Sequence, residues 1–458
     1  MYSTARTETG PSEQDPWFDP GLTPGTERLR QVAEAVADAV EHHGAKRALK
    51  PQERKKLHDI LARVIANLVH HYLTGNGGGV VVSRSKKVLG AKPSRYRPLP
   101  LPETFPKWLD GLEALGFAKQ RKGVYVNWPE KARRTTVQAA AKLIRLIQEH
   151  KITFADIRDE GLTEIIMLSR SKLSYWDDDP HSRLTDYRDD ATTRGYRSEL
   201  QTINEWLARA DIQFDGSVYD KRVDVYARRL YRRFTQGRFD SGGRLFGGFW
   251  QSLPNKPERF PYSVRLRGLR IDGEPVIGLD YSQLNPILCY SVAQAEPPPG
   301  DAYTLPGLEP YRDGVKRVFN AMLFRHPVAK FPKRTSKEIE ERKALFPKGI
   351  KCGGVVATIL YCHPKLKRVL SSGNIGHHLQ FLESQIMMRV LRRCRERNVI
   401  ALPVFDCVVV RASVEATVGE IMLREFKAVA GLNITVKREL PEPGEDNSLD
   451  ARAHASGL

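Results

Sequence analysis

The chain has 458 residues, of which 41% are hydrophobic and 28% are charged, and its 73 Lys and Arg against 54 Asp and Glu give a formal net charge of +19. This composition is typical of a soluble globular protein, and no apolar run approaches the ~20 residues of a membrane span, which excludes a membrane protein. The positive charge favours binding to polyanions, so nucleic acid is the expected partner. The five cysteines form no Cys-x-x-Cys pair and indicate a reducing, cytoplasmic compartment rather than a disulfide framework or a zinc module.

Residues 1–28 are predicted to form a disordered tail. They carry acidic residues such as Glu8 and Asp15 and no apolar segment, which also argues against a signal peptide. Residues 29–170 are predicted to form a mostly helical N-terminal domain, because "QVAEAVADAV" and "LHDILARVIANLV" have apolar residues at helical spacing. Residues 133–170 also have a pattern typical of helices.

Within this domain, "PKWLDGLEALGFAKQRKGVYVNW" predicts a helix that ends near Gly116, followed by a basic hairpin that turns at Lys122 and Gly123. This order resembles the recognition helix and wing of winged-helix domains, which bind nucleic acid. A purely packing role for the helix and hairpin is the alternative.

Residues 171–239 are predicted to form a helical, thumb-like connecting region, with an acidic loop before a helix at about residues 197–212. From residue 240 onward the pattern changes to α+β with an antiparallel sheet. The segment "SVRLRGLRIDGEPVIGLD" reads as a hairpin with Asp272-Gly273 as its tight turn, and a long helix is expected from about residue 375 to 397.

The end of the chain is predicted to contain a second hairpin. In "VIALPVFDCVVVRA" two apolar half-strands flank Phe405-Asp406, and a helix capped by Ser413 and Gly431 precedes a final strand, "NITVKREL".

Two aspartates, Asp280 and Asp406, are expected at strand ends or hairpin bends in apolar surroundings. Neighbouring antiparallel strands would bring them close together, and two close carboxylates favour a bound divalent cation. Two ions, Mg²⁺ or Mn²⁺, held by these aspartates would support in-line phosphoryl transfer. From the spacing alone, an N-cap or salt-bridge role for both residues is the simpler explanation.

The segment "LDYSQLNP" looks like the first palm motif of family A DNA polymerases, and "PVFDCVVV" is similar to the third. Between them, "RDGVKRVFNAMLF" resembles the fingers helix of these enzymes and of bacteriophage-type single-subunit RNA polymerases. The order of the motifs identifies the chain as a divergent relative of these palm-domain polymerases. The resemblance implies a right-hand-like α+β fold for residues 240–458, with helical fingers inserted at about residues 301–375.

The resemblance also implies roles for individual residues. The catalytic residues would be Asp280, Asp406 and Lys316, with Asp280 and Asp406 as the metal ligands. The nucleotide would be bound by Arg312, Lys316, Asn320, Phe324, Asn285 and Tyr281. Because the four fingers residues follow one another at four-residue steps, they form one slowly drifting stripe on a helix. A solvated basic edge of an amphipathic helix is the alternative.

Two further segments are similar to nucleic-acid contacts of these families. Asp240, Gly243 and Arg244 form D-x-x-G-R, which looks like the template-contacting motif of single-subunit RNA polymerases, and "GHHLQFLESQ" loosely resembles the helix at the primer terminus, with His378 and Gln380 as candidates. The neighbouring aromatics could stack on unpaired bases, although a core role is favoured for them: Phe246, Phe249 and Trp250. The chain departs from the family at Phe405, where a His is usual, and at Cys407, where DNA polymerases carry a Glu.

The sugar preference is not settled by the sequence. Asn285 stands where DNA polymerases carry a Glu that excludes ribose, which favours ribonucleotides, but Phe324 stands where RNA polymerases usually carry a Tyr. The sequence therefore predicts a template-directed nucleotidyltransferase, primase-like and tolerant of ribonucleotides, that acts on a DNA or RNA template-primer with nucleoside triphosphates. A bacterial, phage or mobile-element setting is expected. The alternatives are a replication initiator or regulator with a degenerate palm, and a two-metal nuclease.

Overall fold

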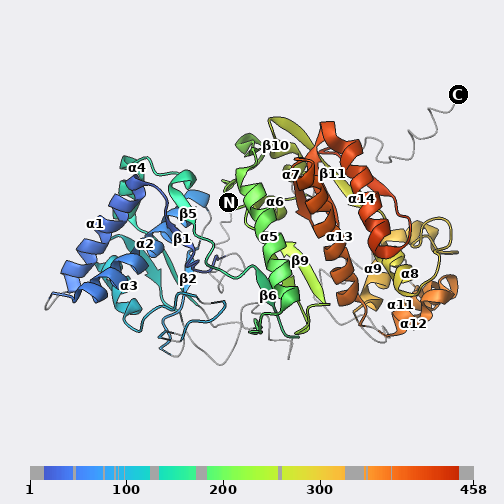
Figure 1. The fold of residues 1–458 in the computed structure, drawn as a ribbon, viewed down its shortest axis with the longest axis horizontal. Helices are drawn as coiled ribbons and strands as arrows, with labels where there is room; N and C mark the ends of the chain where they lie inside the picture. Colours follow the sequence, from blue (N-terminus) through green and yellow to red (C-terminus); the bar gives the residue numbers. More distant parts are fainter. Residues whose placement is uncertain are drawn as a thin grey trace, which may run out of the picture. The chain divides into compact units, whose positions relative to one another are not determined.

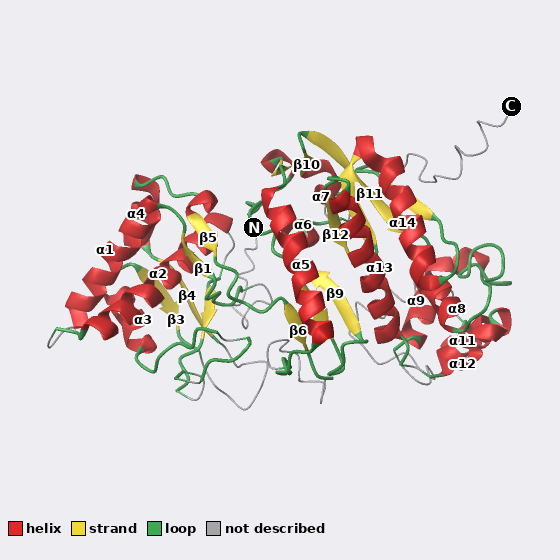
Figure 2. Cartoon of the chain, viewed as in Figure 1, coloured by secondary structure: helices red, strands yellow, loops and turns green. Residues whose placement is uncertain are grey.

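The computed structural model of the chain describes residues 15–44, 48–75, 78–86, 89–90, 92–96, 98–123, 134–171, 183–255, 260–324, 345–346, 349–372 and 374–442. The fold mixes helices with several antiparallel sheets (Figures 1 and 2). The chain divides into two compact units. Unit 1 comprises residues 1–164 and 219–226, and unit 2 comprises residues 165–218 and 227–458. Among the described residues, no helix is both long and apolar enough to cross a membrane.

Unit 1 contains helices around a small antiparallel sheet with the strand order β2-β4-β3. The helices are α1 (Glu27–Gly44), α2 (Pro51–Thr74), α3 (Phe105–Ala114) and α4 (Ala141–Glu149), and the strands of this sheet are β2 (Val80–Val82), β3 (Ala118–Arg121) and β4 (Thr135–Ala139). The apolar sides of the helices meet in one core with Val80, Val82 and Val137 of the sheet. Unit 1 therefore has a core of its own.

Two predictions for this unit are wrong. Residues 133–170 are not helical throughout, because β4 precedes α4, and the β-branched residues Thr135, Thr136 and Val137 favour the strand. Strand β3 pairs with β4, so no tight turn lies at Lys122 and Gly123. The connection between β3 and β4 includes residues 124–133, which lie outside the described residues.

Part of the predicted disordered tail is ordered. Strand β1 (Leu22–Pro24) pairs antiparallel with β5 (Ile157–Asp159), so the chain before α1 belongs to the fold of unit 1. Residues 1–14 lie outside the described residues. The strand pairing explains the difference, because it depends on a segment more than 130 residues away that local composition does not reveal.

The main sheet of unit 2 has the strand order β12-β13-β11-β10-β7, and β14 pairs with β11 as well. Its strands are β7 (Ile212–Phe214), β10 (Leu269–Ile271), β11 (Glu274–Tyr281), β12 (Ala401–Val404), β13 (Cys407–Arg411) and β14 (Val436–Glu439). The hairpin at Asp272-Gly273 is confirmed, since Ile271 pairs with Glu274 and both turn residues have positive φ, 51° and 76°. The β11 strand is central, and Asp280 is its next-to-last residue.

Helices α13 (Gly376–Glu396) and α14 (Glu415–Ala430) lie side by side in Figure 1 and pack on each other. The prediction of a long helix at about 375–397 is thereby confirmed, and its buried side includes Leu379, Ile386, Val390 and Cys394. Helix α14 ends at Gly431 in the left-handed conformation, as predicted. Ser413 does not cap α14, because a short 3₁₀ turn (Ala412–Val414) precedes the helix.

Residues 171–239 do not form a separate connecting region. Helix α5 (Ala191–Arg209) packs on α13, β7 extends the main sheet, and β8 (Tyr231–Phe234) pairs with β9 (Gly242–Phe246) and β6 (Ile166–Leu168). The remaining α-helices in the described part of unit 2 are α6 (Phe249–Ser252), α7 (Val264–Gly268), α8 (Leu284–Val292), α9 (Arg312–Met322), α11 (Cys352–Cys362) and α12 (Lys367–Ser371). Of the predicted fingers insertion, residues 325–344, 347–348 and 373 lie outside the described residues.

Candidate catalytic site at the end of strand β11

The register of the sheet brings Asp280 and Asp406 to the same end of two neighbouring strands. Asp280 on β11 pairs with Cys407 on β13, and Asp406 directly precedes Cys407 in the turn between β12 and β13. The amide of Tyr281 donates to the carbonyl oxygen of Asp406 at 3.4 Å. The two aspartates, which are 126 residues apart in sequence (406 − 280), are therefore neighbours in the fold.

The charges around Asp280 act on its carboxyl group. Burial and, after it, the nearby carboxylates of Asp406 and Glu439 raise the pKa of Asp280 to about 8, while the charges of Lys316 and Lys437 oppose the shift. Without a cation, the negative charge at this site is thus poorly compensated. Carboxylate oxygens are the ligands that Mg²⁺ and Mn²⁺ prefer, so this donor set fits divalent cations.

Glu439 is a third acidic residue at this site that the sequence reading missed. In the β11–β14 ladder Glu439 pairs with Gly278, two residues before Asp280 and hence on the same face of the sheet. A Cβ at position 278 would lie 3.1 Å from Oε2 of Glu439, so the glycine provides the space that this carboxylate occupies. The only signal in the sequence was the alternation of "VKRE" in the last strand. The sequence did not indicate with which strand this segment pairs.

The turn that carries Asp406 is strained. Phe405 has φ of +59°, a left-handed conformation that costs a non-glycine residue roughly 1–2 kcal/mol. The ring of Phe405 contacts the ring of Phe246 at a centroid distance of 5.7 Å, and the guanidinium carbon of Arg244 lies 5.2 Å from its centre. These contacts fix the residue next to Asp406.

Helix α9 carries the predicted nucleotide-binding stripe. Lys316 is exposed, and its charge is close enough to lower the pKa of Asp280. Arg312 is paired with Asp301, and its guanidinium carbon lies 5.3 Å from the centre of the Tyr303 ring. Lys316 is therefore the better candidate for binding a phosphate, since Arg312 already has an acidic partner.

Two residues of the stripe contact other parts of unit 2. Asn320 accepts a hydrogen bond of 2.9 Å from Nδ2 of Asn285, which follows β11. Phe324, at the end of α9, makes an edge contact of 5.1 Å with the ring of His377 at the start of α13. The structure thus brings the predicted sugar-contacting residue, Asn285, and helix α9 together.

Tyr281 lies apart from these residues. Its side chain is buried on the opposite face of the sheet from Asp280, where its hydroxyl donates to the carbonyl oxygen of Met422 at 2.8 Å and its ring lies against Phe426. Alternation along β11 explains the placement, because adjacent residues of a strand point to opposite faces. This position of Tyr281 does not fit the predicted nucleotide contact.

The D-x-x-G-R segment is directed toward α13. Gly243 has φ of +82°, and a Cβ there would lie 2.9 Å from Oγ of Ser384. Arg244 makes a bidentate ion pair with the buried Glu383, at 2.7 and 2.6 Å. These interactions within the chain account for the glycine and the arginine without a template. Phe249 and Trp250 are buried, which confirms the core role favoured for them.

Two of the remaining candidates for nucleic-acid contact, Asp240 and His378, line a cavity of about 270 Å³, and Gln380 does not. Nδ1 of His378 lies 3.3 Å from the carbonyl oxygen of Asp240, whose carboxylate forms an ion pair with Arg238. Gln380 hydrogen-bonds His377, and burial lowers the pKa of His377. The residues that line the cavity are Gln236, Arg238, Asp240, Ser241, Asn374, His377 and His378.

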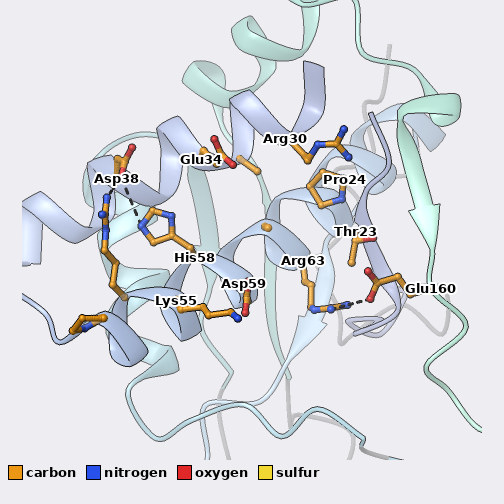
Figure 3. A pocket seen from close by; sticks show the side chains of 14 residues that line it. Thr23, Pro24, Arg30, Glu34, Asp38, Lys55, His58, Asp59, Arg63 and Glu160 are labelled. Carbon is orange, nitrogen blue, oxygen red and sulfur yellow. Dashed lines mark hydrogen bonds and ion pairs between the residues drawn. The ribbon is translucent and has the colours of Figure 1, made fainter. Parts of the chain in front are cut away.

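Unit 1 has its own cavity, of about 680 Å³, shown in Figure 3. Near it lies the one group of three potential metal ligands within 4.8 Å of each other that the described part of the chain contains: Asp38, Glu41 and His58. Arg54 pairs with Asp38 and Glu41 at 3.0 and 2.9 Å, so the protein itself partly compensates the negative charge of this cluster. Since the described residues contain no other such group, the carboxylates of Asp280, Asp406 and Glu439 do not all lie within 4.8 Å of one another.

The α3 helix does not present a basic surface. Arg84 binds Asp110 with two hydrogen bonds of 2.9 and 2.8 Å, and these interactions lower the pKa of Asp110 to about 2. Gln120 bonds to Asp110 and to Glu113 on the same helix. Helix α3 is followed by strand β3, as predicted for the recognition helix and the wing. The acidic side chains of α3, however, do not favour a nucleic-acid contact through this helix.

Comparison with known proteins gives little support for any family. No family model matches the chain, and no curated protein matches it. Among solved structures, the chain is similar to the POL domain of Pol1 from M. smegmatis, in complex with DNA primer-template and dNTP. The two share 11% identity, the match covers 92% of this chain and 67% of that chain, and the TM-score is 0.29. This distant resemblance carries no weight for the activity or ligands of this chain.

Proposed function

We propose that the chain is a template-directed nucleotidyltransferase that extends a nucleic-acid strand by two-metal phosphoryl transfer. The observation that carries the proposal is the β11–β13 register, which puts Asp280 and Asp406 together at the end of one sheet. The charge of Lys316 on α9 acts on this pair. An exposed cation beside two acids is suited to a nucleotide whose phosphate tail is negative and whose reacting phosphorus must be close to the metals.

Asp280 and Asp406 would hold two Mg²⁺ or Mn²⁺ ions, which would activate the attacking hydroxyl group and stabilise the leaving oxygen when bound. Lys316 would neutralise the triphosphate. The template and primer would approach along the side of the cavity lined by Asp240 and His378, where polar groups from two segments meet. Glu439 would add negative charge next to Asp280 and strengthen the attraction for cations.

The sugar is contacted, in this proposal, by the amide pair of Asn285 and Asn320. Their mutual hydrogen bond leaves the carbonyl oxygen of Asn285 and the amide group of Asn320 for other partners. Ribose hydroxyls can both donate and accept, and no carboxylate stands at this position to exclude them. We therefore infer that ribonucleotides are accepted along with deoxyribonucleotides.

Primer-extension and unprimed synthesis assays with Mg²⁺ or Mn²⁺ test the proposal, with dNTPs and rNTPs compared on DNA and RNA templates. Asp280→Asn and Asp406→Asn should each reduce incorporation by roughly 10³-fold or more, since each removes a charge needed in the transition state. The matched control is Asp211→Asn, an exposed aspartate of the same unit. Incorporation that survives both substitutions would exclude the proposal.

A two-metal nuclease would use the same two aspartates, and Lys316 separates the two functions. A nuclease has no triphosphate to bind, so Lys316→Ala should leave hydrolysis of a nucleic-acid strand unchanged. In a polymerase the same variant should raise KM for the nucleotide by roughly 10-fold or more. Strand cleavage without incorporation would favour the nuclease.

A further inference from the structure

The side chain of Arg244 connects α13 with the turn that carries Asp406. Its Nε and Nη2 atoms donate to Oε1 and Oε2 of Glu383, at 2.7 and 2.6 Å. The Glu383 side chain is 4% exposed and that of Arg244 is 29% exposed, so the pair lies mostly inside the protein. A buried carboxylate held by a planar two-pronged donor has little freedom to move.

The guanidinium of Arg244 also contacts the ring of Phe405. The guanidinium carbon of Arg244 lies 5.2 Å from the ring centre, within the range of a cation–π contact. The ring also contacts Phe246, which is two residues after Arg244 on β9. Two side chains of β9 thus contact the Phe405 ring, although its backbone has a φ of +59°, which residues other than glycine rarely adopt.

Asp406 follows Phe405 in a turn of only two residues, between Val404 and Cys407. In so short a turn, the direction of the Asp406 side chain depends on the backbone angles of Phe405. A continuous set of contacts therefore runs from Glu383 through Arg244 and Phe405 to the proposed metal ligand.

We propose that Arg244 and Glu383 are positioning residues, which hold the Phe405-Asp406 turn in the conformation that directs Asp406 toward Asp280. Arg244 then acts on the catalytic group and not on the template. The inference rests on the proposed function for its kinetic readout. The competing role, a contact of Arg244 with a nucleic-acid phosphate, would require the guanidinium to leave a buried carboxylate.

Three variants test the proposal in the full chain: Arg244→Lys, which keeps the charge but loses the fork, Phe405→Leu, which removes the ring, and the double variant. Three quantities are measured: kcat at saturating substrates, Kd for a primer-template duplex without metal, and Kd for Mn²⁺ alone. The matched control is Arg389→Lys, because Arg389 also binds a buried glutamate, Glu425, at 2.8 Å, but on the side where α13 meets α14.

Each single variant should lower kcat by roughly 10- to 100-fold and weaken Mn²⁺ binding by about 10-fold, with Kd for the duplex changed less than about twofold. The double variant should lose no more than the worse single variant, because the residues act in series. The control should match the wild type in all three quantities. A duplex Kd that weakens in step with kcat would overturn the proposal, as would losses that multiply in the double variant.

The Mn²⁺ measurement separates this proposal from the function on which it rests. A wild type that binds Mn²⁺ but incorporates no nucleotide refutes the proposed function, and the effects of the variants on Mn²⁺ affinity still decide the positioning role. A wild type that binds no Mn²⁺ refutes both. Because Phe405 is partly exposed in a turn, Phe405→Leu is the variant least affected by a folding defect.

Discussion

His363 is fixed by two hydrogen bonds whose directions define its protonation. The carbonyl oxygen of Ala302 can only accept, so Nε2 of His363, 2.9 Å away, carries the proton. Nδ1 then accepts from the hydroxyl of Tyr290 at 2.8 Å. Burial lowers the pKa of His363, and the neutral ring joins the helix after β11 to the predicted fingers.

This histidine should make the stability of unit 2 sensitive to acid. Since its pKa is lower in the folded than in the unfolded state, its contribution is complete above the unfolded value of ~6.5 and is lost as the pH falls below it. His363→Gln should therefore be less stable than the wild type at pH 7.5, with a smaller difference at pH 5.5, as measured by thermal unfolding. A difference that does not change with pH would contradict this assignment.

Asp280 should have the opposite effect when no metal is present. Its pKa of about 8 exceeds the unfolded value, so the folded state gains stability from the protonated form at low pH and loses it as the pH rises toward 8. Asp280→Asn should unfold at a higher temperature than the wild type at pH 8 without metal, and the gap should close near pH 4. Added Mn²⁺ should stabilise the wild type and not the variant. A destabilised variant at pH 8 would show that the carboxylate is compensated by groups other than the metal.

At the scale of elements, the contact between α9 and α13 depends on a glycine. The amide of Gly376 donates to the carbonyl oxygen of Leu323 at 2.8 Å, and a Cβ at residue 376 would lie 2.4 Å from the ring of Phe324. Gly353, in the first turn of α11, has nothing within 4 Å of such a Cβ. The same substitution should therefore have opposite effects in the two helices.

Gly376→Ala should destabilise the protein by about 1–3 kcal/mol through overpacking, or displace Phe324 and raise KM for the nucleotide. Gly353→Ala should stabilise by up to about 1 kcal/mol, because alanine favours the helix and space is available. Denaturant unfolding and nucleotide kinetics of both variants provide the measurement. Equal effects of the two substitutions would show that the ring of Phe324 does not pack on α13 in solution.

The elements that local patterns specify were predictable from the sequence. Asp272-Gly273 has the residues that its tight turn requires, and the apolar side of α13 follows from its spacing. The β4 strand was missed because "TTVQAAAKLI" contains both β-branched and helix-favouring residues, and only the pairing with β2 and β3 decides between them.

For the candidate site, the sequence indicated the acids at the ends of β11 and of the β12–β13 hairpin, since aspartates in apolar runs are distinctive. It could not indicate Glu383 or Glu439. Their roles depend on contacts with Arg244 and with Gly278 across 139 and 161 residues (383 − 244 and 439 − 278), which no local pattern records. The ion pair of Arg244 with Glu383 was not predictable for the same reason, and a template contact of Arg244 stays a prediction.

At the scale of the whole molecule, the two units have separate cores, and all the proposed catalytic residues belong to unit 2. Calorimetry of the full chain should therefore show two unfolding transitions, of which Mn²⁺ raises only one. Phe105→Ala, in the core of unit 1, should lower the free energy of unfolding of unit 1 by about 3–5 kcal/mol and so shift the other transition to a lower temperature. A single transition that both changes shift together would show that the units unfold as one.

Residues 219–226 belong to unit 1 although the chain on both sides of them belongs to unit 2. Within unit 1, Asp224 of this segment pairs with His70 at 2.6 Å. The backbone consequently crosses between the units after Glu164, Val218 and Tyr226, so one proteolytic nick at Glu164 would leave the fragments interlocked by the returning segment. The two fragments produced in this way should co-purify, and together they should behave like the uncut chain.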